Sequence, residues 1–241
     1  MYGFGPYGYY YGLDWTYILV LIGAVICMIA SANVKSTYSR FSKHRSMTGM
    51  TGAQVAERLL RNAGLNDVRV GHVAGELSDH YNPATKVVNL SDSVYGSTSV
   101  AAIGVAAHEC GHAIQHAKGY APLKFRTWFV PIANFGSKLA WPVILLGLFI
   151  NSQSSQMIID AGIFLFSFAL IFQVVTLPVE FNASSRALAL LEQQGILSEQ
   201  ELPYTKKVLG AAALTYVAAV ASTLLQLLRI VMLFGGRRRN D

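Results

Sequence analysis

Four long stretches of the chain are almost entirely apolar and interrupt an otherwise mixed pattern of hydrophobic and polar residues. They run from about residue 15 to 33, 128 to 150, 157 to 179 and 209 to 234. A helix rises about 1.5 Å per residue, so each stretch is long enough to cross roughly 30 Å of hydrocarbon. The pattern therefore predicts four membrane-spanning helices.

The segment between the first two stretches is more polar, and its periodicity changes from helical to strand-like. Residues 51–63 carry apolar side chains at helical spacing. Residues 68–73 and 86–90 are typical of strands, and the stretch between them, 78–85, is rich in turn-forming residues. The pattern predicts a small α/β unit outside the membrane.

A further helix is expected to follow, and it carries the chemistry of the chain. Residues 97–98 offer a Ser or Thr cap for a helix that reaches about residue 116. This helix contains H-E-x-x-H, formed by His108, Glu109 and His112. Two histidines four residues apart project from one face of a helix and can bind one tetrahedral zinc ion. Glu109 would lie beside the metal as the general base that activates a water molecule.

A catalytic zinc needs a third protein ligand. His116 is close in sequence, but residues 108 to 116 of one helix rise by about 12 Å, too far for one ion. Glu180 is the better candidate, because it is a carboxylate at the end of an apolar span, where it needs a partner. The alternative for Glu180 is an ordinary carboxylate at a helix start, stabilised by the helix dipole.

Composition supports the membrane interpretation. Charged residues make up 13% of the chain and hydrophobic residues 53%, whereas soluble proteins average about 25% charged residues. The net charge of +6 does not indicate nucleic-acid binding, because the basic residues form no stripe with interleaved aromatic residues. They lie beside the apolar stretches, where we expect contact with headgroups of the lipid bilayer.

The basic residues also predict an orientation. They follow the first span, among residues 35–45, and none precedes it, which predicts an uncleaved anchor with an external N-terminus. The short link 151–156 makes the second and third spans a hairpin, so Glu180 returns to the side of the α/β unit. We expect this side, with the active site, to face the cytoplasm. Arg237–Arg239 disagree, since they would lie outside if the fourth stretch crosses fully. Their side is left open.

The fold class expected is a mainly α multi-pass membrane protein with a small α/β, zincin-like cytoplasmic catalytic part. Its predicted parts are a Tyr/Gly-rich N-terminus (1–14), span 1 (15–33), the α/β segment (34–127), a hairpin of spans 2 and 3 (128–179), a segment with the third zinc ligand (180–208), span 4 (209–234) and a basic tail (235–241).

Several segments together resemble the YugP-type bacterial neutral zinc metallopeptidases. They are DHYNP at 79–83, LS at 90–91, AAIGVAAHECGHAIQ at 101–115, LPVEFNASSRA at 177–187 and ALTYVA at 213–218. The resemblance covers nearly the whole chain from about residue 15 to 234. It implies a multi-pass protein of the bacterial cell membrane with zinc endopeptidase activity.

A more distant similarity connects the chain to HtpX-type gluzincins. These use two motif histidines and a downstream glutamate as zinc ligands, and the downstream motif is E-x-x-x-D. Here Ser184 stands at the fourth position after Glu180 in place of the aspartate. A serine can make one hydrogen bond to a ligand histidine but brings no charge to it.

The mechanism expected is hydrolysis of a protein or peptide substrate by Glu109-assisted water attack at one catalytic zinc ion. The strand before the active helix, residues 86–90, is expected to form an exposed edge that binds the substrate as an added strand. A second donor for the oxyanion could come from Arg186, Tyr81 or His80. Arg186 could instead orient the ligands or pair with an acid.

Two alternatives from other classes remain. The chain could be a membrane interaction or chaperone-like protein that binds zinc without hydrolytic activity, although the intact Glu109 argues against this. It could also be a structural membrane protein in which the motif arose by chance, and stoichiometric zinc would then be absent. The sequence does not specify the substrate or the oligomeric state.

Overall fold

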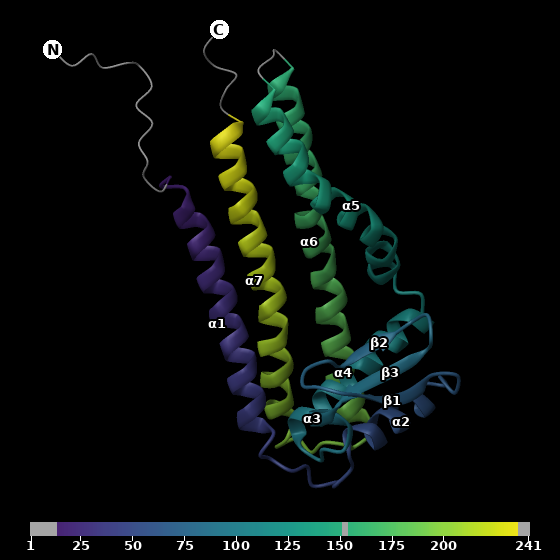
Figure 1. Cartoon of the computed structure of the whole chain (residues 1–241). Coiled ribbons are helices and arrows are strands. Elements are labelled where there is room, and N and C mark those ends of the chain that lie inside the picture. Colours follow the sequence, from purple (N-terminus) through teal and green to yellow (C-terminus); the bar gives the residue numbers. More distant parts are fainter. Residues whose placement is uncertain (1–13, 151–153, 236–241) are drawn as a thin grey trace, which may run out of the picture.

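Four long helices form the body of the protein, and a small α/β part lies at one end of them (Figure 1). The computed structural model describes residues 14–150 and 154–235. The long helices are α1 (Tyr17–Phe41), α5 (Ala121–Phe149), α6 (Ser155–Gln193) and α7 (Leu202–Phe234). The α/β part contains α2 (Gly52–Asn62), β1 (Arg69–Val73), β2 (His80–Asn82), β3 (Val87–Ser91), α3 (Asp92–Tyr95) and α4 (Val100–Ala117).

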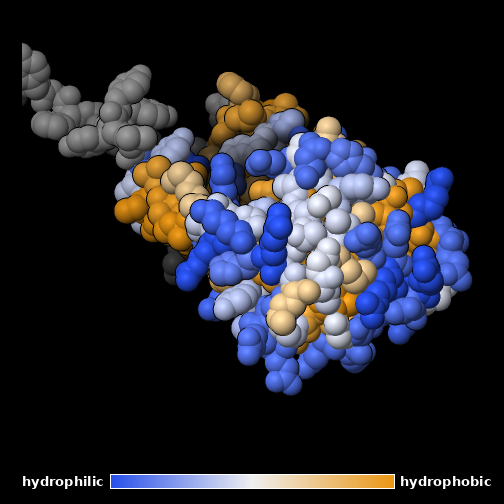
Figure 2. Space-filling model, turned by 90° about the horizontal axis from the view of Figure 1, so that it is seen from below, coloured by the Kyte–Doolittle hydropathy of each residue, from blue (hydrophilic) through white to orange (hydrophobic). Residues whose placement is uncertain are grey.

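The four long helices are each long and apolar enough to cross a membrane. Seen from the end that carries the α/β part, hydrophilic residues predominate there, and hydrophobic residues gather on the helices beyond (Figure 2). The structure agrees with the fold class expected, a mainly α multi-pass arrangement with a small mixed sheet. The predicted N-terminal part (1–14) and basic tail (235–241) lie outside the described residues, apart from residues 14 and 235.

The last long helix, α7, is continuous from Leu202 to Phe234 and is long enough to cross a membrane fully. It runs beside α1, and the start of α1 and the end of α7 lie together at the end opposite the α/β part (Figure 1). An ion pair at this end joins the two helices, with 3.7 Å between Arg229 Nη2 and Asp14 Oδ2. Arg229 also stacks over the ring of Tyr17 at 4.0 Å. The half-buried Arg229 of α7 is therefore paired within the protein.

Small residues let the long helices approach closely. A Cβ added at Gly162 of α6 would lie 2.5 Å from Ile144 Cγ1 of α5, and one at Gly23 of α1 would lie 2.8 Å from Ser222 Oγ of α7. Such close backbone packing is the usual basis of helix association in membranes. Pro131 and Pro142 lie inside α5, and the lower part of α5 bends away from α6 (Figure 1).

The sheet corrects one sequence-based expectation. Its strand order is β1-β3-β2, so β3 is the central strand, parallel to β1 and antiparallel to β2. The prediction that residues 86–90 form the exposed edge is wrong, because β3 is hydrogen-bonded on both sides. The edge strands are β1 and β2, and β2 lies within the stretch read as a turn. Asp79 holds β2 in place, since its carboxylate accepts hydrogen bonds from Ser91 N at 2.7 Å and Ser91 Oγ at 2.9 Å.

Helix α4 lies at the centre of the α/β part and packs on the lower ends of α6 and α7. Ser99, next to the expected cap, accepts a hydrogen bond from Ala102 N at 3.2 Å and starts the helix. Ile103 of α4 is fully buried in a core with Leu59 of α2, Val88 of β3 and Leu191 of α6. This core fixes α4 against α6, and it is this contact that assembles the candidate site.

Candidate metal centre

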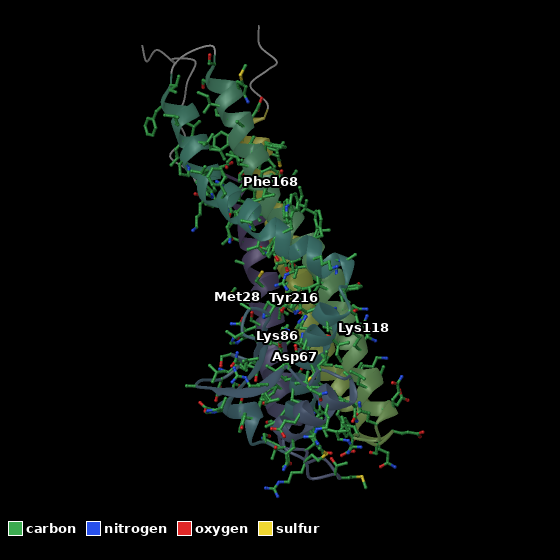
Figure 3. The ribbon with its side chains drawn as sticks, turned by 90° about the vertical axis from the view of Figure 1, so that its right-hand side faces the viewer. Met28, Asp67, Lys86, Lys118, Phe168 and Tyr216 are labelled. Atoms are coloured by element: carbon green, nitrogen blue, oxygen red, sulfur yellow. The ribbon has the colours of Figure 1, made fainter. Side chains whose placement is uncertain are left out.

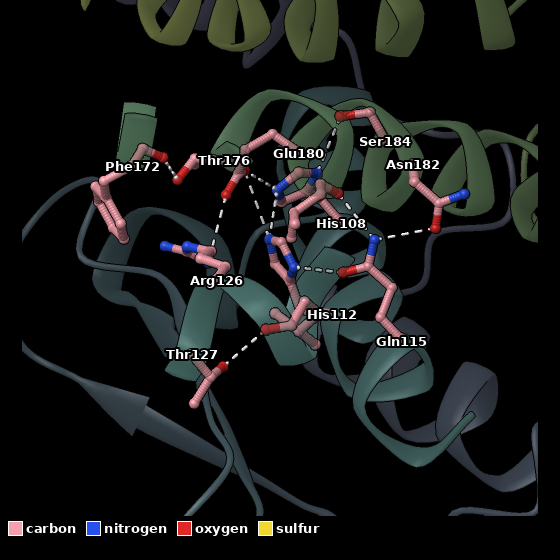
Figure 4. Close-up of polar contacts among 12 residues, drawn as sticks. His108, His112, Gln115, Arg126, Thr127, Phe172, Thr176, Glu180, Asn182 and Ser184 are labelled. Carbon is pink, nitrogen blue, oxygen red and sulfur yellow. Dashed lines mark hydrogen bonds and ion pairs between the residues drawn. The ribbon is translucent and has the colours of Figure 1, made fainter. Parts of the chain in front are cut away.

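Two packed helices bring the three expected metal ligands together. His108 and His112 project from α4, and Glu180 projects from α6 (Figure 4). The distance between the two histidine Nε2 atoms is 3.1 Å. Glu180 Oε2 lies 3.4 Å from His108 Nε2 and 3.6 Å from His112 Nε2. One atom from each side chain therefore points to a common position.

These spacings fit a tetrahedral zinc ion. Zinc binds histidine nitrogen and carboxylate oxygen at about 2.0–2.2 Å, so two ligand atoms of a tetrahedral site lie roughly 3.3–3.5 Å apart. Glu180 is 3% exposed, and its Oε2 has no hydrogen-bond partner among the described residues. A buried carboxylate oxygen without a partner is unfavourable unless a cation satisfies it. The donor set and the spacing both fit zinc.

The position of Glu180 within α6 excludes the alternative reading as a carboxylate at a helix start. Helix α6 is continuous from Ser155 to Gln193 and passes through Glu180. The side chain reaches α4 because Gly111 permits close packing: a Cβ there would lie 2.7 Å from the carbonyl oxygen of Ala183. A larger residue at 111 would therefore push α4 away from α6 and separate the histidines from Glu180.

The outer nitrogens of both histidines are held by polar side chains. His108 Nδ1 lies 3.1 Å from Ser184 Oγ, so the serine that replaces the gluzincin aspartate does contact a ligand histidine. His112 Nδ1 lies 3.0 Å from Gln115 Oε1. The amide nitrogen of Gln115 is turned the other way and donates to the carbonyl oxygen of Val179 at 2.8 Å. Gln115 Oε1 must then accept from His112 Nδ1, which leaves Nε2 of His112 free to bind a metal.

Gln115 also connects the site to Arg186. Its amide nitrogen makes a second hydrogen bond to Asn182 Oδ1 at 3.0 Å, and Asn182 Oδ1 accepts another from Arg186 Nε at 2.7 Å. Arg186 lies over the ring of Tyr120 and lines a separate hollow with Lys118. The structure thus places Arg186 behind the ligands, outside the hollows that border His108 and Glu109.

Two hollows meet at the candidate metal position. Both are lined by Asp79, His108, Glu109, Glu180 and Tyr216. The first, which we call the polar hollow, has a volume of about 300 Å³ and lies between the β2 edge and α5. The second, the apolar hollow, has a volume of about 160 Å³ and lies between α1, α4 and α7.

Glu109 faces both hollows and is 8% exposed. Its carboxylate is not part of the three-ligand group formed by His108, His112 and Glu180. A carboxylate beside a metal position, and not bound to it, is what a general base requires. The structure therefore separates the expected base from the expected ligands.

The other expected residues lie at the rim. His80 and Tyr81 of β2 line the polar hollow, together with His116 of α4. The hydroxyl group of Tyr81 lies 3.0 Å from His116 Nδ1. His80 is held by Asn89 Nδ2 at 3.1 Å and Ser78 O at 2.8 Å. His116 does not join the ligand group, as the rise of the helix predicted.

Two residues at the site were not singled out from the sequence. Arg126 Nη1 of α5 lies 3.9 Å from Glu180 Oε1, and Tyr216 of α7 lines both hollows. Tyr216 lies at about the height of Met28 of α1 and above Asp67 and Lys86 of the α/β part (Figure 3). Arg126 precedes an apolar stretch, where a cation usually indicates only the membrane boundary. Tyr216 occurs in one of the segments that carry the family resemblance, but its sequence neighbours gave no indication that its hydroxyl group lies at the site.

Cys110 lies inside the motif but outside the site. Its side chain is fully buried, and its thiol points to the carbonyl oxygen of Ala56 at 3.6 Å. Burial raises the pKa of this thiol far above its usual value, so it stays protonated and unreactive. The thiol is turned away from the candidate ligands and toward α2.

Comparisons with known proteins identify the family of the chain. The family described as "Putative neutral zinc metallopeptidase" matches residues 16–235. The chain is 45% identical over 226 residues to the "Putative membrane protease YugP" of Bacillus subtilis (strain 168). The aligned region covers 93% of this chain and 99% of that protein. No solved structure matches the chain.

Proposed function

Because the chain belongs to the neutral zinc metallopeptidase family, we propose that it is a membrane-embedded zinc endopeptidase. His108, His112 and Glu180 hold one catalytic zinc ion, and Glu109 is the general base. The observation that carries the proposal is the convergence of three ligand atoms on one position, with the buried Glu180 Oε2 lacking any other partner among the described residues. A bound zinc ion supplies Lewis acidity, which activates water and polarises a carbonyl group.

In this mechanism Glu109 moves the proton. Its carboxylate takes a proton from the attacking water and then passes it to the nitrogen of the leaving amine. The low exposure of Glu109 keeps bulk water from competing for that proton. Ser184 and Gln115 keep the two ligand histidines oriented during this step, because they hold the Nδ1 atoms.

Arg126 and Tyr216 are the donors we assign to the negative charge that develops on the substrate carbonyl. Both line the polar hollow beside Glu109, and both reach the site from the long helices. A positioned donor of this type commonly contributes about 10²- to 10³-fold to the rate. Tyr81 and His80 lie further out on β2, where they fit substrate contact better. Arg186 fits support of the ligands, through Asn182.

The substrate is expected to bind along β2. This strand is the sheet edge that borders the polar hollow, and its residues His80 and Tyr81 line it. An extended peptide can pair with such an edge through its main chain, which gives affinity with little dependence on sequence. The proposal therefore keeps strand addition as the binding mode and moves it from β3 to β2.

We place the protein in the bacterial cell membrane with the α/β part in the cytoplasm. The curated relative is named a membrane protease, and four helices here are long and apolar enough to span. Basic residues gather around the end of α1 that adjoins the α/β part: Lys35 and Arg40 lie within the helix, and Lys43 and Arg45 follow it. An excess of Lys and Arg in short flanking segments favours the cytoplasmic side.

The test uses the protein purified in detergent, with Glu109→Gln and Glu180→Ala variants. We expect about one zinc per chain in the wild type and in Glu109→Gln, strongly reduced zinc in Glu180→Ala, and cleavage of casein by the wild type alone. Absence of zinc from the wild type after reconstitution would overturn the proposal. Zinc without cleavage of any unfolded protein tested would favour the alternative, a zinc-binding interaction protein without hydrolytic activity.

A further inference from the structure

The two hollows that meet at the candidate metal position differ in chemistry. The polar hollow is bordered by polar and charged side chains such as His80, Tyr81, His116 and Arg126. The apolar hollow is lined mainly by aliphatic side chains. They include Val34 of α1, Leu77, Val105 of α4, and Val208, Ala212 and Ala213 of α7. A peptide whose reacting bond lies at His108 and Glu109 would therefore meet different surroundings on its two sides.

We propose that the apolar hollow is a specificity pocket that takes an aliphatic or aromatic side chain of the peptide substrate next to the bond that is cleaved. The proposal rests on the proposed function, because the pocket is defined by its junction with the catalytic residues. His108, Glu109 and Glu180 line it directly, so a side chain that fills it belongs to a residue at the reacting bond.

The size of the pocket fits one such side chain. Its volume is about 160 Å³, and a dry protein cavity of about 150 Å³ is large enough to bind benzene. A Leu, Met or Phe side chain gains from leaving water for such surroundings. An acidic side chain would lose its hydration there and would also meet the carboxylates of Asp79, Glu109 and Glu180, which line the pocket.

The pocket also explains why α1 and α7 belong to the active site. The two helices are in contact above it, where Cys27 Sγ of α1 lies 3.6 Å from the carbonyl oxygen of Ala218 of α7. Lower down, Val34 of α1 and Ala212 of α7 both face the hollow. Side chains from the apolar helices thus select the substrate residue, while β2 binds the main chain.

The test measures binding without hydrolysis. Zinc-loaded Glu109→Gln protein in detergent is titrated calorimetrically with two peptidyl hydroxamates that differ only in carrying Leu or Gly beside the chelating group. We expect the Leu compound to bind about 10- to 100-fold more tightly. In the same background, Val34→Phe and Ala212→Phe each fill the hollow from a different helix. In each variant the affinities for the Leu and Gly compounds should differ by no more than about threefold.

Gly210→Phe is the matched control, because it adds the same bulk to α7 at a position where a new Cβ meets nothing within 4 Å. Its ratio of affinities for the Leu and Gly compounds should equal that of the background protein.

Equal affinity of the background protein for the two compounds would overturn the specificity pocket while the zinc site stands. An unchanged ratio of affinities in both filled variants would do the same. Zinc missing from the wild type would instead overturn the proposed function, and the pocket with it. Discrimination without casein cleavage would support the pocket and place the failure in hydrolysis.

Discussion

At the scale of single residues, the site depends on polar side chains that touch the ligands from behind. Gln115 is fully buried, although it is polar, and every part of its amide is used. It contacts His112, Val179 and Asn182, so it joins α4 to α6 and orients a ligand at the same time. Partners of this type commonly change metal affinity by about 10- to 100-fold.

We predict that Gln115→Leu lowers zinc affinity by about 10- to 100-fold, because His112 loses the acceptor that fixes its Nδ1 proton. Gln193→Leu, an exposed position near the end of α6, is the control and should bind zinc as the wild type does. Zinc affinity is measured by chelator competition, and thermal unfolding of the metal-free proteins separates lost orientation from lost folding. Equal affinities of the two variants would show that Gln115 does not position His112.

The sequence was sufficient to predict which three residues converge at the candidate site and insufficient for the residues around them. His108, His112 and Glu180 could be found because a spaced motif and an isolated carboxylate in an apolar segment both demand a partner. Arg126 and Tyr216 reach the site from helices far apart along the chain. Their roles depend on how those helices pack, and no local pattern records that packing.

At the scale of elements, the same division appears in the sheet. Residues 87–91 are recognisably a strand, but whether a strand is central or at an edge depends on its neighbours. Strand β2 has three residues, followed by Pro83, and local composition favours a turn there. The hydrogen bonds from Ser91 to Asp79 are made between segments distant in sequence, and they hold residues 80–82 as a strand despite the local preference for a turn. Strand β2 is therefore the sheet edge beside the site.

One carboxylate holds two connecting segments together at the start of α7. Glu201 is buried and accepts hydrogen bonds from Met47 N in the α1–α2 connection and from Ser198 N in the α6–α7 connection, both at 2.8 Å. Burial raises the pKa of Glu201, but the hydrogen bonds from the backbone of Ser198 and Met47 outweigh burial and lower it. The carboxylate therefore stabilises the fold in its charged form.

We predict that Glu201→Gln lowers the unfolding temperature at neutral pH, and that the difference from the wild type shrinks as the pH falls. A lowered folded-state pKa gives stability that is present above the unfolded value of about 4.3 and is lost as the pH falls through the folded value. Glu199→Gln, at an exposed neighbouring position, is the control and should change little. Thermal unfolding in detergent between pH 7 and 3 is the measurement. A difference independent of pH would contradict the role of the charge.

At the scale of the whole molecule, the arrangement of the four helices ties the site to one side of the membrane. The α/β part lies at one end of the long helices (Figure 1), and the candidate metal ligands belong to α4 of this part and to α6. Further basic residues lie at this end: Lys118 precedes α5, Lys124 lies in the first turns of α5, and Lys206 and Lys207 lie in the first turns of α7. At the opposite end Arg229 is paired with Asp14, and the tail with Arg237–Arg239 follows α7 in the sequence. The larger group, which includes the residues directly after α1, favours a cytoplasmic α/β part.

We predict that Thr85→Cys, in the exposed turn between β2 and β3, resists a membrane-impermeant maleimide in intact cells and reacts after permeabilisation. Met157→Cys, exposed at the far end of the hairpin formed by α5 and α6, should react in intact cells. Both variants are made in a protein in which Cys27 is replaced and Cys110 is kept. The buried thiol of Cys110 should stay unlabelled in the folded protein and so serves as an internal control for folding. The reverse pattern would place the candidate metal site outside the cell and would contradict the orientation inferred from the basic residues around the end of α1. Labelling of both positions in intact cells would contradict the crossing of α5 and α6, since one hairpin cannot then separate residues 85 and 157.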